Sequence, residues 1–386
     1  MGKKQFAYIN GEILKWLREQ TPLSLFDVSE ILSINQSDLM LWEDKQYLPS
    51  ITQARKLAKL YKVPLASLYL SEVPKISLVR YVDRRTQTTD IPKITASLWD
   101  KLYEMVSYRH AAIELLDNED FYFNTLGIDI NANETDLSLQ IRKWLGIKTP
   151  INISAFKGSS FNYFKSFFEA KNILVFRFSS IPVEEVRGIS LHYNVLPFIG
   201  VNNNDSDAAK TFTLFHELTH ILKRNSSMCS VEEFDSDTKE ELYCNRVAAE
   251  VLMPKAILKE DKHISRIINN WDDNEVDKCS RRYGVSKQAL IRKLYDIKLI
   301  DKELFESKNT QYQEEYLQIK KQHEIFNKKQ EVKLKYSTLL LSRIGNLYPS
   351  IVFDALYSGK ITYGQVSQYL NVKTKHISKI ESAVFK

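Results

Sequence analysis

The chain has 386 residues, of which 44% are hydrophobic and 26% charged, values that are ordinary for a globular protein and predict two to four domains. Its net charge of +6 is mildly basic and excludes a protein that coats nucleic acid with its whole surface. The sequence holds no apolar run long enough for a membrane span and no secretory signal pattern, so we expect no membrane partner.

Residues 1–75 are predicted to form an N-terminal domain of short helices. Ser24 and Asp27 are suited to cap the second helix, and Asn35 is suited to cap the third. Three stretches resemble the signatures of Xre/Cro-type helix-turn-helix domains: Leu39-x-x-Trp42-Glu43, Leu48-Pro49-Ser50 and Leu57-Ala58-x-x-Tyr61-x-Val63-Pro64. The resemblance implies that the third helix enters the major groove of DNA.

The third helix would present Asn35, Gln36 and Ser37 as candidate base contacts. Met40 and Leu41 give the same helix an apolar surface, which favours protein docking or dimerisation. Residues 1–75 hold ten Lys or Arg against eight Asp or Glu, so little counterion release would accompany DNA binding. DNA binding through this domain and protein docking, including a homodimer, therefore both stay open.

Residues 76–135 are predicted to be a helical connector around an amphipathic helix at 98–116. Residues 136–300 are predicted to be the next domain. It begins with two helices, continues with strands at 172–178, 186–193 and 198–202, and then turns into a helix.

That helix, Thr211–Arg224, contains the motif His216-Glu217-Leu218-Thr219-His220. Its apolar residues recur at spacings of three and four, as in an amphipathic helix. Residues four apart lie on one face, so His216 and His220 can present two imidazole nitrogens to one metal ion. Glu217 lies at the rim of that site, where a carboxylate can activate water. This is the arrangement of zinc hydrolases, and it makes one Zn²⁺ per chain the expected cofactor.

A second helix is predicted at 239–255, ended by Pro254. Glu241 and Asn245 share one of its faces. Glu241 is the candidate third ligand that catalytic zinc requires. Asn245 is suited to orient a ligand histidine through the second ring nitrogen. The alternative is that Glu241, like Glu240 and Glu250, is a solvated helix charge.

The two helices carry FTLFHELTHIL at 212–222 and ELYCNRVAAEVLMP at 241–254, which resemble the ImmA/IrrE metallopeptidases. The resemblance extends over residues 172–294. It implies that His216, His220 and Glu241 bind zinc and that Glu217 is the general base. It also implies a gluzincin-like fold, and a substrate, because characterised members of the family cleave helix-turn-helix repressors in mobile elements or stress responses.

In gluzincin-like enzymes the strand beside the HExxH helix is a sheet edge to which an extended substrate adds. We expect residues 198–202 to be that edge strand. His192 and Tyr193 on the preceding strand are candidates for contacting the oxyanion, and a purely structural role is the commoner alternative.

Residues 301–335 are predicted to be a charged helical linker, and residues 336–386 a C-terminal helical domain with a helix-turn-helix-like pattern at 361–377. A phosphate backbone and a partner protein are both open as its target. The side chains suited to phosphate contact are Lys373, Lys375, His376 and Lys379.

Together these patterns predict an α+β, mostly helical protein. The leading hypothesis is a zinc-dependent endopeptidase that cleaves a helix-turn-helix repressor or similar regulatory protein in a mobile-element, stress-response or toxin–antitoxin setting. The alternative is a DNA-binding transcriptional regulator or antitoxin-like protein, with a toxin or regulator as partner, whose zinc domain is a sensor or partner-binding scaffold. The three cysteines have no paired spacing and fit a reducing cytoplasm.

Overall fold

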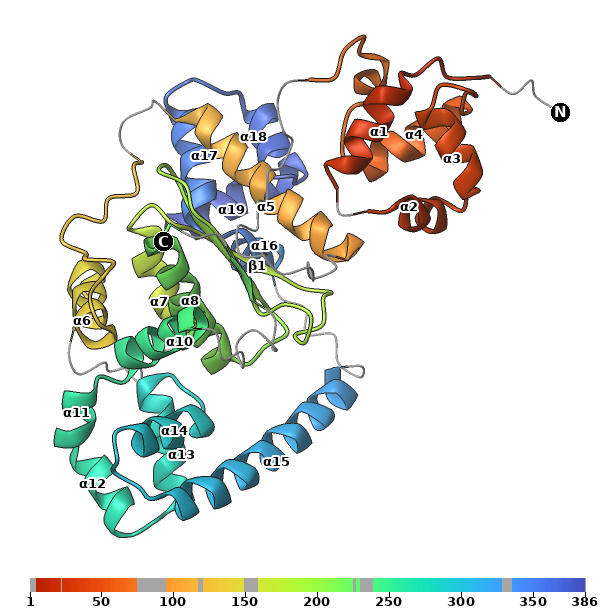
Figure 1. Cartoon of the computed structure of the whole chain (residues 1–386). Helices are drawn as coiled ribbons and strands as arrows, with labels where there is room; N and C mark the ends of the chain where they lie inside the picture. The colour runs from red at the N-terminus through yellow and green to blue at the C-terminus, as the bar shows by residue number, and fades with distance from the viewer. Residues whose placement is uncertain are drawn as a thin grey trace. The chain divides into compact units, whose positions relative to one another are not determined.

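The computed structural model describes residues 5–21, 23–74, 95–116, 121–148, 159–224, 227–229, 239–327 and 335–385 (Figure 1). By its internal contacts the chain divides into two compact units, Met1–Glu104 and Met105–Lys386. Each unit has its own hydrophobic core. Within the predicted connector at 76–135, residues 76–94 and 117–120 lie outside the described residues.

The first unit is helical. Its elements are α1 (Gly11–Glu19), α2 (Leu25–Leu32), α3 (Gln36–Glu43), α4 (Ile51–Leu60) and the 3-10 helix η1 (Leu65–Tyr69), followed by the first half of α5 (Ala96–Leu115). As predicted, Ser24 caps α2 in a capping box with Asp27. Asn35 is the N-cap residue of α3 but makes no side-chain capping hydrogen bond. Val28, Leu39 and other apolar residues fill a core that belongs to this unit alone.

The second unit is built around a four-stranded mixed sheet in the order β1-β3-β2-β4. The strands are β1 (Leu174–Phe178), β2 (Gly188–Leu191), β3 (Phe198–Asn202) and β4 (Ser227–Cys229). β1 runs parallel to β3, whereas β2 runs antiparallel to both β3 and β4. β3 therefore lies inside the sheet, and the prediction that residues 198–202 form an edge strand is wrong. The three-residue β4 provides the edge beside β2, and the sequence around it showed only a polar loop.

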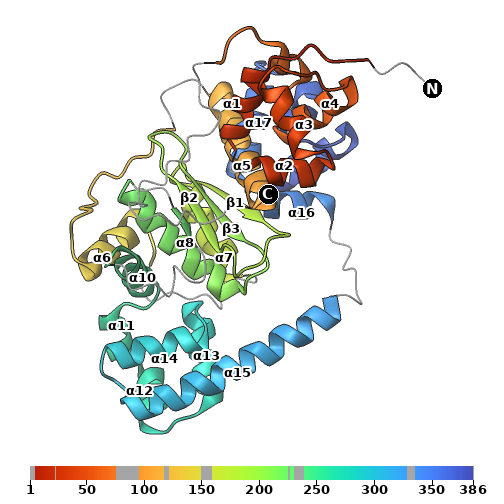
Figure 2. The ribbon, with the colours of Figure 1, turned by 45° about the vertical axis from the view of Figure 1, so that its right-hand side comes forward.

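Helices α7 (Ser160–Glu169) and α8 (Asp207–Leu222) pack on one face of this sheet (Figure 2). The second half of α5 covers the other face, where Tyr108 lies with its ring 6.0 Å from that of Phe176. Nearly every residue of β1, β2 and β3 is buried as a result. A sheet covered on both faces reads as continuous apolar runs in the sequence, as these three strands do.

The C-terminal helices pack against β1 and α7. They are α16 (Tyr336–Ile344), α17 (Leu347–Tyr357), α18 (Tyr363–Tyr369), the 3-10 helix η3 (Thr374–His376) and α19 (Ile377–Val384). Buried Glu169 of α7 accepts a hydrogen bond from the backbone N–H of Asn346 at 2.8 Å, at the start of α17. Arg177 of β1 donates to the carbonyl of Ser342 at 2.5 Å. These helices therefore share the packing of the second unit.

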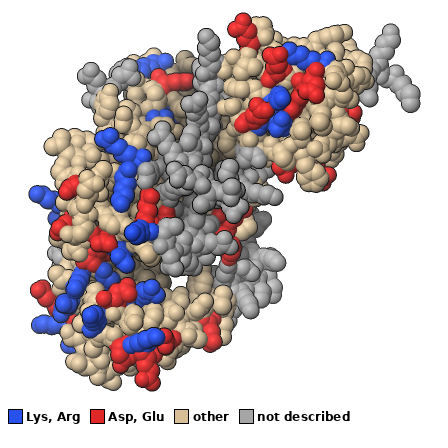
Figure 3. All heavy atoms as spheres, in the orientation of Figure 1, with Lys and Arg blue, Asp and Glu red and all other residues tan. Residues whose placement is uncertain are grey.

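The remaining described helices of the second unit are one that precedes the sheet and six that lie between α8 and α16 in the chain. They are α6 (Glu134–Leu145), which precedes the sheet, and α10 (Lys239–Leu252), α11 (Lys255–Glu260), α12 (Lys262–Asn269), α13 (Asp273–Tyr283), α14 (Lys287–Asp296) and α15 (Lys302–Asn327). α10 packs against both α8 and α6, and α15 packs along α14. On the face shown in Figure 3, basic and acidic side chains are interspersed over the lower part of the molecule, where Figure 1 places α11–α15.

The fold is α+β and mostly helical with a small mixed sheet, so the predicted fold class is confirmed. Among the described residues, no helix combines the length and apolar character needed to cross a bilayer. The division into five segments stays a prediction.

Candidate metal centre

Helix α8 positions the HExxH motif. Ser206 caps the helix by accepting a hydrogen bond from the N–H of Ala209. The whole stretch from Thr213 to Leu222 is buried, because the sheet covers one side of α8 and α7 and α10 cover others. His216, Glu217 and His220 are all fully buried, so their polar groups need partners inside the protein.

Three side-chain donors converge between α8 and α10. The Nε2 atoms of His216 and His220 lie 3.0 Å apart. The carboxylate of Glu241 lies 3.1 Å from the first and 3.4 Å from the second. Four tetrahedral ligands at 2.0–2.1 Å from one zinc ion would lie about 3.3 Å from each other, so these separations fit a single small ion. Among the described residues this trio forms a buried cluster of metal-binding type.

The second nitrogen of each histidine is also engaged. Nδ1 of His216 lies 2.9 Å from Oδ1 of Asn245. An amide oxygen only accepts, so Nδ1 carries the proton and Nε2 keeps a lone pair for a metal. Nδ1 of His220 lies 3.6 Å from the carboxylate of Glu240 and 3.7 Å from the buried thiol of Cys244. Both histidines thus have their Nε2 atoms turned toward Glu241.

The charge balance of the centre suits a cation. Burial raises the pKa of the Glu241 carboxyl, but hydrogen bonds and charge from His216 and His220 outweigh burial and hold that pKa well below its usual range. Glu241 therefore stays ionised beside the two histidines. An anionic carboxylate and two imidazole nitrogens form a ligand set that zinc uses in hydrolases.

Glu217 lies on the sheet side of α8. Its Oε2 accepts a hydrogen bond from Ser227 of β4 at 2.5 Å, and Ser227 in turn lies 2.8 Å from the hydroxyl of Ser190 in β2. No described residue hydrogen-bonds the other oxygen, Oε1, which is buried. One oxygen is thus fixed by the sheet, and the other has no hydrogen-bond partner among the described residues.

Gly188 makes this approach of α8 to β2 possible. A Cβ at this position would lie 2.5 Å from both Oε1 of Glu217 and Cγ2 of Thr213. Such distances are far inside van der Waals contact. A glycine within a strand pattern is a recognised signal of close approach by a neighbour, so the sequence carried this information. Ser190 and Ser227 had no comparable signal.

The two residues proposed for oxyanion contact have structural partners. His192 follows the end of β2 and hydrogen-bonds the backbone of Ile221. Tyr193 lies under the guanidinium of Arg109, whose Cζ is 3.4 Å from the ring centroid. Tyr193 and Arg109 also line a cavity of about 470 Å³. These contacts match the structural alternative for both residues.

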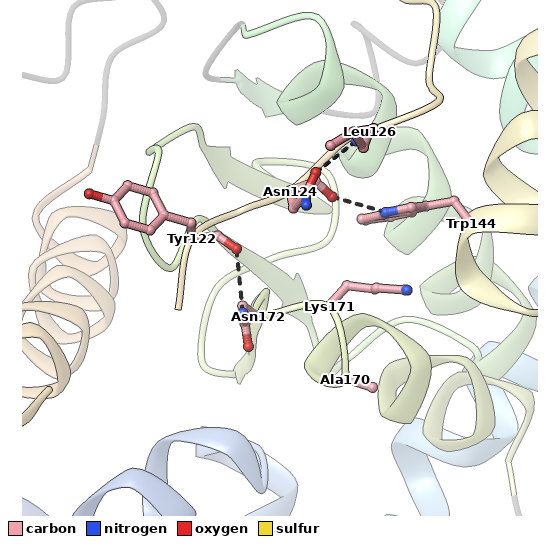
Figure 4. Close-up of a pocket in the computed structure, with 7 residues that line it drawn as sticks. All are labelled: Tyr122, Asn124, Leu126, Trp144, Ala170, Lys171 and Asn172. Atoms are coloured by element: carbon pink, nitrogen blue, oxygen red, sulfur yellow. Dashed lines mark hydrogen bonds between the residues drawn. The ribbon is translucent and has the colours of Figure 1, made fainter. Parts of the chain in front are cut away.

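A second cavity, of about 260 Å³, lies between the chain before α6 and the end of α7 (Figure 4). Hydrogen bonds from Trp144 to the carbonyl of Asn124 and from Asn172 to that of Tyr122 hold its walls together. Neither cavity is lined by Glu241 or by a residue of the HExxH motif.

The predicted DNA contacts of the first unit are exposed. Asn35, Gln36 and Ser37 lie at the start of α3. Met40 and Leu41 on the same helix are 47% and 37% exposed, as the docking alternative requires. The structure places these five residues on a surface and leaves the choice between DNA and protein open.

Two histidines on one helix with the buried Glu217 between them, and a glutamate on the next helix, form a pattern that is typical of metallopeptidases. Residues 168–295 match the family model of the IrrE N-terminal-like domain, Peptidase_M78. This match confirms the resemblance to the ImmA/IrrE family over that segment. The segment contains β1–β4, α8, α10 and the three converging donors, so the centre lies inside the peptidase-family domain. The Xre/Cro-type assignment of the N-terminal domain stays a prediction. No curated protein matches the chain.

Proposed function

We propose that this protein is a zinc-dependent endopeptidase whose ion is held by His216, His220 and Glu241. The observation that carries this proposal is the convergence of the three donors within 3.4 Å of each other, with the buried Glu217 next to His216 in the chain. A zinc ion bound there would polarise a scissile carbonyl and lower the pKa of water towards about 7.

Glu217 is the proposed general base. Its free Oε1 accepts the proton of the attacking water, and the same carboxylate then delivers a proton to the leaving amine. Ser227 holds Oε2, so the carboxylate keeps one orientation through both transfers. A carboxylate fixed in this way reduces the reorganisation that proton transfer requires.

The first experiment measures zinc in the purified full chain, with His216→Ala and Glu241→Ala beside the wild type. We expect about one zinc ion per wild-type chain and loss of the ion in both variants. His263→Ala and Glu260→Ala are matched controls, since both residues are exposed and belong to α12 and α11. Zinc retained by both ligand variants, or absent from wild type prepared without chelators, would contradict the proposed site.

The second experiment separates metal binding from catalysis. Glu217→Gln preserves the size of the side chain and its hydrogen bond to Ser227, but removes the basic oxygen. We expect this variant to bind zinc like the wild type and to lose cleavage of a proteome-derived peptide library, read by mass spectrometry. Undiminished cleavage by Glu217→Gln would remove Glu217 from the reaction.

The proposed substrate is a helix-turn-helix repressor or similar regulatory protein, in a mobile-element, stress-response or toxin–antitoxin setting. This class follows from the resemblance to the ImmA/IrrE family. Incubation of the purified chain with repressors encoded next to its gene, followed by mass spectrometry of the fragments, tests it. A cleaved repressor that stays intact with Glu217→Gln would support the assignment, and cleavage confined to unrelated proteins would contradict it.

The regulator hypothesis makes an opposite prediction for the same residue. A zinc domain that only senses or binds a partner has no need of the Glu217 carboxylate. Glu217→Ala should then regulate its target promoter in cells as well as the wild type does. Loss of regulation in this variant, with zinc retained, would favour the peptidase.

A further inference from the structure

The helix pairs α2–α3, α13–α14 and α18–α19 share a turn that also follows other helices of the chain, such as α14 and α17. In each of the three pairs a residue in the left-handed region lies just after the first helix, separated from it by Leu370 in the last pair, and the next residue donates its N–H to a carbonyl five positions back. The left-handed residues are Ser33, Gly284 and Asn371. The hydrogen bonds run from Ile34 to Ser29, from Val285 to Ser280 and from Val372 to Ser367. A cap of this kind is common at helix C-termini and is compatible with a helix-turn-helix motif.

The first and last pairs also correspond position by position. Each begins with a capping box, made by Ser24 in α2 and Thr362 in α18. Nine residues after the cap each has its left-handed residue. The buried residues coincide as well. They are Val28 with Val366, Leu39 with Ile377, and Trp42 with Ile380. The two pairs therefore share their capping box, their turn and three buried positions.

The exposed positions of the second helix differ between the pairs. α3 shows Gln36, Ser37, Met40 and Leu41, two of which are apolar. The corresponding positions of η3 and α19 are Thr374, Lys375, Ser378 and Lys379, all of them exposed. The last pair thus carries two ammonium groups and two hydroxyls at these positions, where the first pair has two polar and two apolar side chains. These are side chains that contact phosphates and base edges.

The middle pair is covered by another helix. Lys287 at the start of α14 pairs with Glu315 of α15, and its ammonium lies 4.4 Å from the ring centre of Tyr312. Arg292 lies over the ring of Phe305 at 5.6 Å. Since α15 packs along α14, the face that would enter a DNA groove is occupied. We therefore assign the α13–α14 pair a role in packing and not in DNA binding.

The charge of the C-terminal helices supports the same distinction. Residues 335–385 contain six Lys or Arg and two Asp or Glu, whereas residues 5–74 contain seven and eight. The acidic residue of α19, Glu381, is already engaged by the hydroxyl of Tyr357. The positive charge therefore lies on the part of the chain whose recognition positions are polar, and duplex DNA is the partner of complementary charge.

We propose that α18, η3 and α19 form a DNA-binding site that places the face of α19 in the major groove of duplex DNA. Lys375 and Lys379 contact phosphates or guanine edges, and the hydroxyls of Thr374 and Ser378 contact base edges. Val366, Ile377 and Ile380 are buried, and α17 packs against both α18 and α19. This site is independent of the metal centre, and it gives the chain a target on DNA through its C-terminal helices.

The test is fluorescence anisotropy of the full chain with a fluorescein-labelled mixed-sequence duplex of about 30 base pairs. We expect micromolar binding at about 0.1 M salt, the range of sequence-independent binding by such domains. Lys375→Ala/Lys379→Ala should weaken it. Each lost phosphate contact costs about fivefold at about 0.15 M salt, or roughly 30-fold for both, and lowers the salt slope by about 0.9.

Lys56→Ala/Lys59→Ala is the matched control, because both lysines are exposed on α4 of the first unit and the charge removed is the same. This control should bind like the wild type. No binding by the wild type would overturn the proposal. So would a loss confined to the α4 variant, which would move the site to the first unit, or equal binding of single-stranded DNA and duplex RNA.

Base contact has its own test. Duplexes selected by the wild type from a random pool should share a sequence. Thr374→Ala/Ser378→Ala should lose that preference but keep its affinity for the mixed duplex, because phosphate contacts carry affinity and base contacts carry specificity. An unchanged preference, or none in the wild type, would contradict the placement of α19 in the groove.

Discussion

The hydroxyl of Ser227 donates a hydrogen bond of 2.5 Å to Oε2 of Glu217. Both residues are buried, and they come from different elements, the edge strand β4 and the helix α8. The strand therefore contacts the carboxylate that we propose as the general base directly, through a side chain. Since Ser227 also contacts Ser190, the orientation of Glu217 depends on two neighbouring strands.

Removal of this hydroxyl should slow cleavage without loss of zinc. Ser227→Ala deletes one hydrogen bond to a charged group, which is worth about 1.5 kcal/mol, or roughly tenfold in kcat. KM should be unchanged, and Ser227→Thr should restore most of the rate. Steady-state kinetics on an identified cleavage peptide, with zinc content as control, measures the effect. A variant with normal kcat would show that Glu217 is held by its other surroundings.

Asn245 should control metal affinity, since its amide oxygen fixes the tautomer of His216. We expect Asn245→Ala to weaken zinc binding by about 10–100-fold, the usual effect of removing a partner of a ligand histidine. Competition with a chelating indicator measures the change. Arg246→Ala is the control, because this exposed neighbour pairs with Glu134 on the surface. Equal zinc affinity in Asn245→Ala and the control would refute this role.

Gly188→Ala should damage both stability and activity. The added methyl group would lie 2.5 Å from Glu217 and Thr213, so α8 must move away from β2. Overpacking of this kind costs about 1–3 kcal/mol, and the displaced carboxylate should lower the cleavage rate as well. Denaturant unfolding and the peptide assay measure the two effects. Gly364→Ala is the control, since the nearest atom to its added Cβ lies 3.9 Å away.

Asp273 should make the packing of α13 and α15 dependent on pH. Burial raises the pKa of its carboxyl, but hydrogen bonds from Tyr312, Trp271 and Lys308 outweigh burial and hold it well below its usual range. A carboxyl with a depressed pKa stabilises the fold above its unfolded-state value, near 4, and this stabilisation is lost as the pH falls below it.

Asp273→Asn should therefore destabilise the protein by about 1–2 kcal/mol at neutral pH, less than a fully buried charged hydrogen bond because solvent screens part of the interaction. The difference from the wild type should shrink below about pH 4. Thermal unfolding of both proteins across this range measures it. A difference that is constant with pH would mean that the ionised form of Asp273 is not what stabilises α15.

The centre was readable from the sequence because its ligands lie on helices. A helix fixes the relation between His216 and His220 through spacing alone, and the next helix carries Glu241 within a recognisable pattern. The orienting role expected of Asn245 has its geometric counterpart in the contact with His216. Each of these relations is local, so one chain segment contains the information for it.

The order and pairing of the strands could not be predicted from the sequence in this way. The order β1-β3-β2-β4 places residue 198 beside 174 and 191, and no local pattern specifies such pairing. The prediction of an edge at residues 198–202 failed for this reason. Ser227 was missed because a three-residue strand in a polar stretch has no periodicity to detect.

The packing of the C-terminal helices determines which fragments of this protein can be expressed in folded form. The segment that matches the peptidase family ends at residue 295, yet the face of the sheet bearing Phe176 is closed by Tyr108, and Tyr108 packs on Tyr348 with ring centres 4.9 Å apart. A gene fragment encoding only residues 168–295 would leave that face bare and would be prone to aggregate. The segment that matches the family model is therefore shorter than the part of the chain that is needed to cover both faces of its sheet.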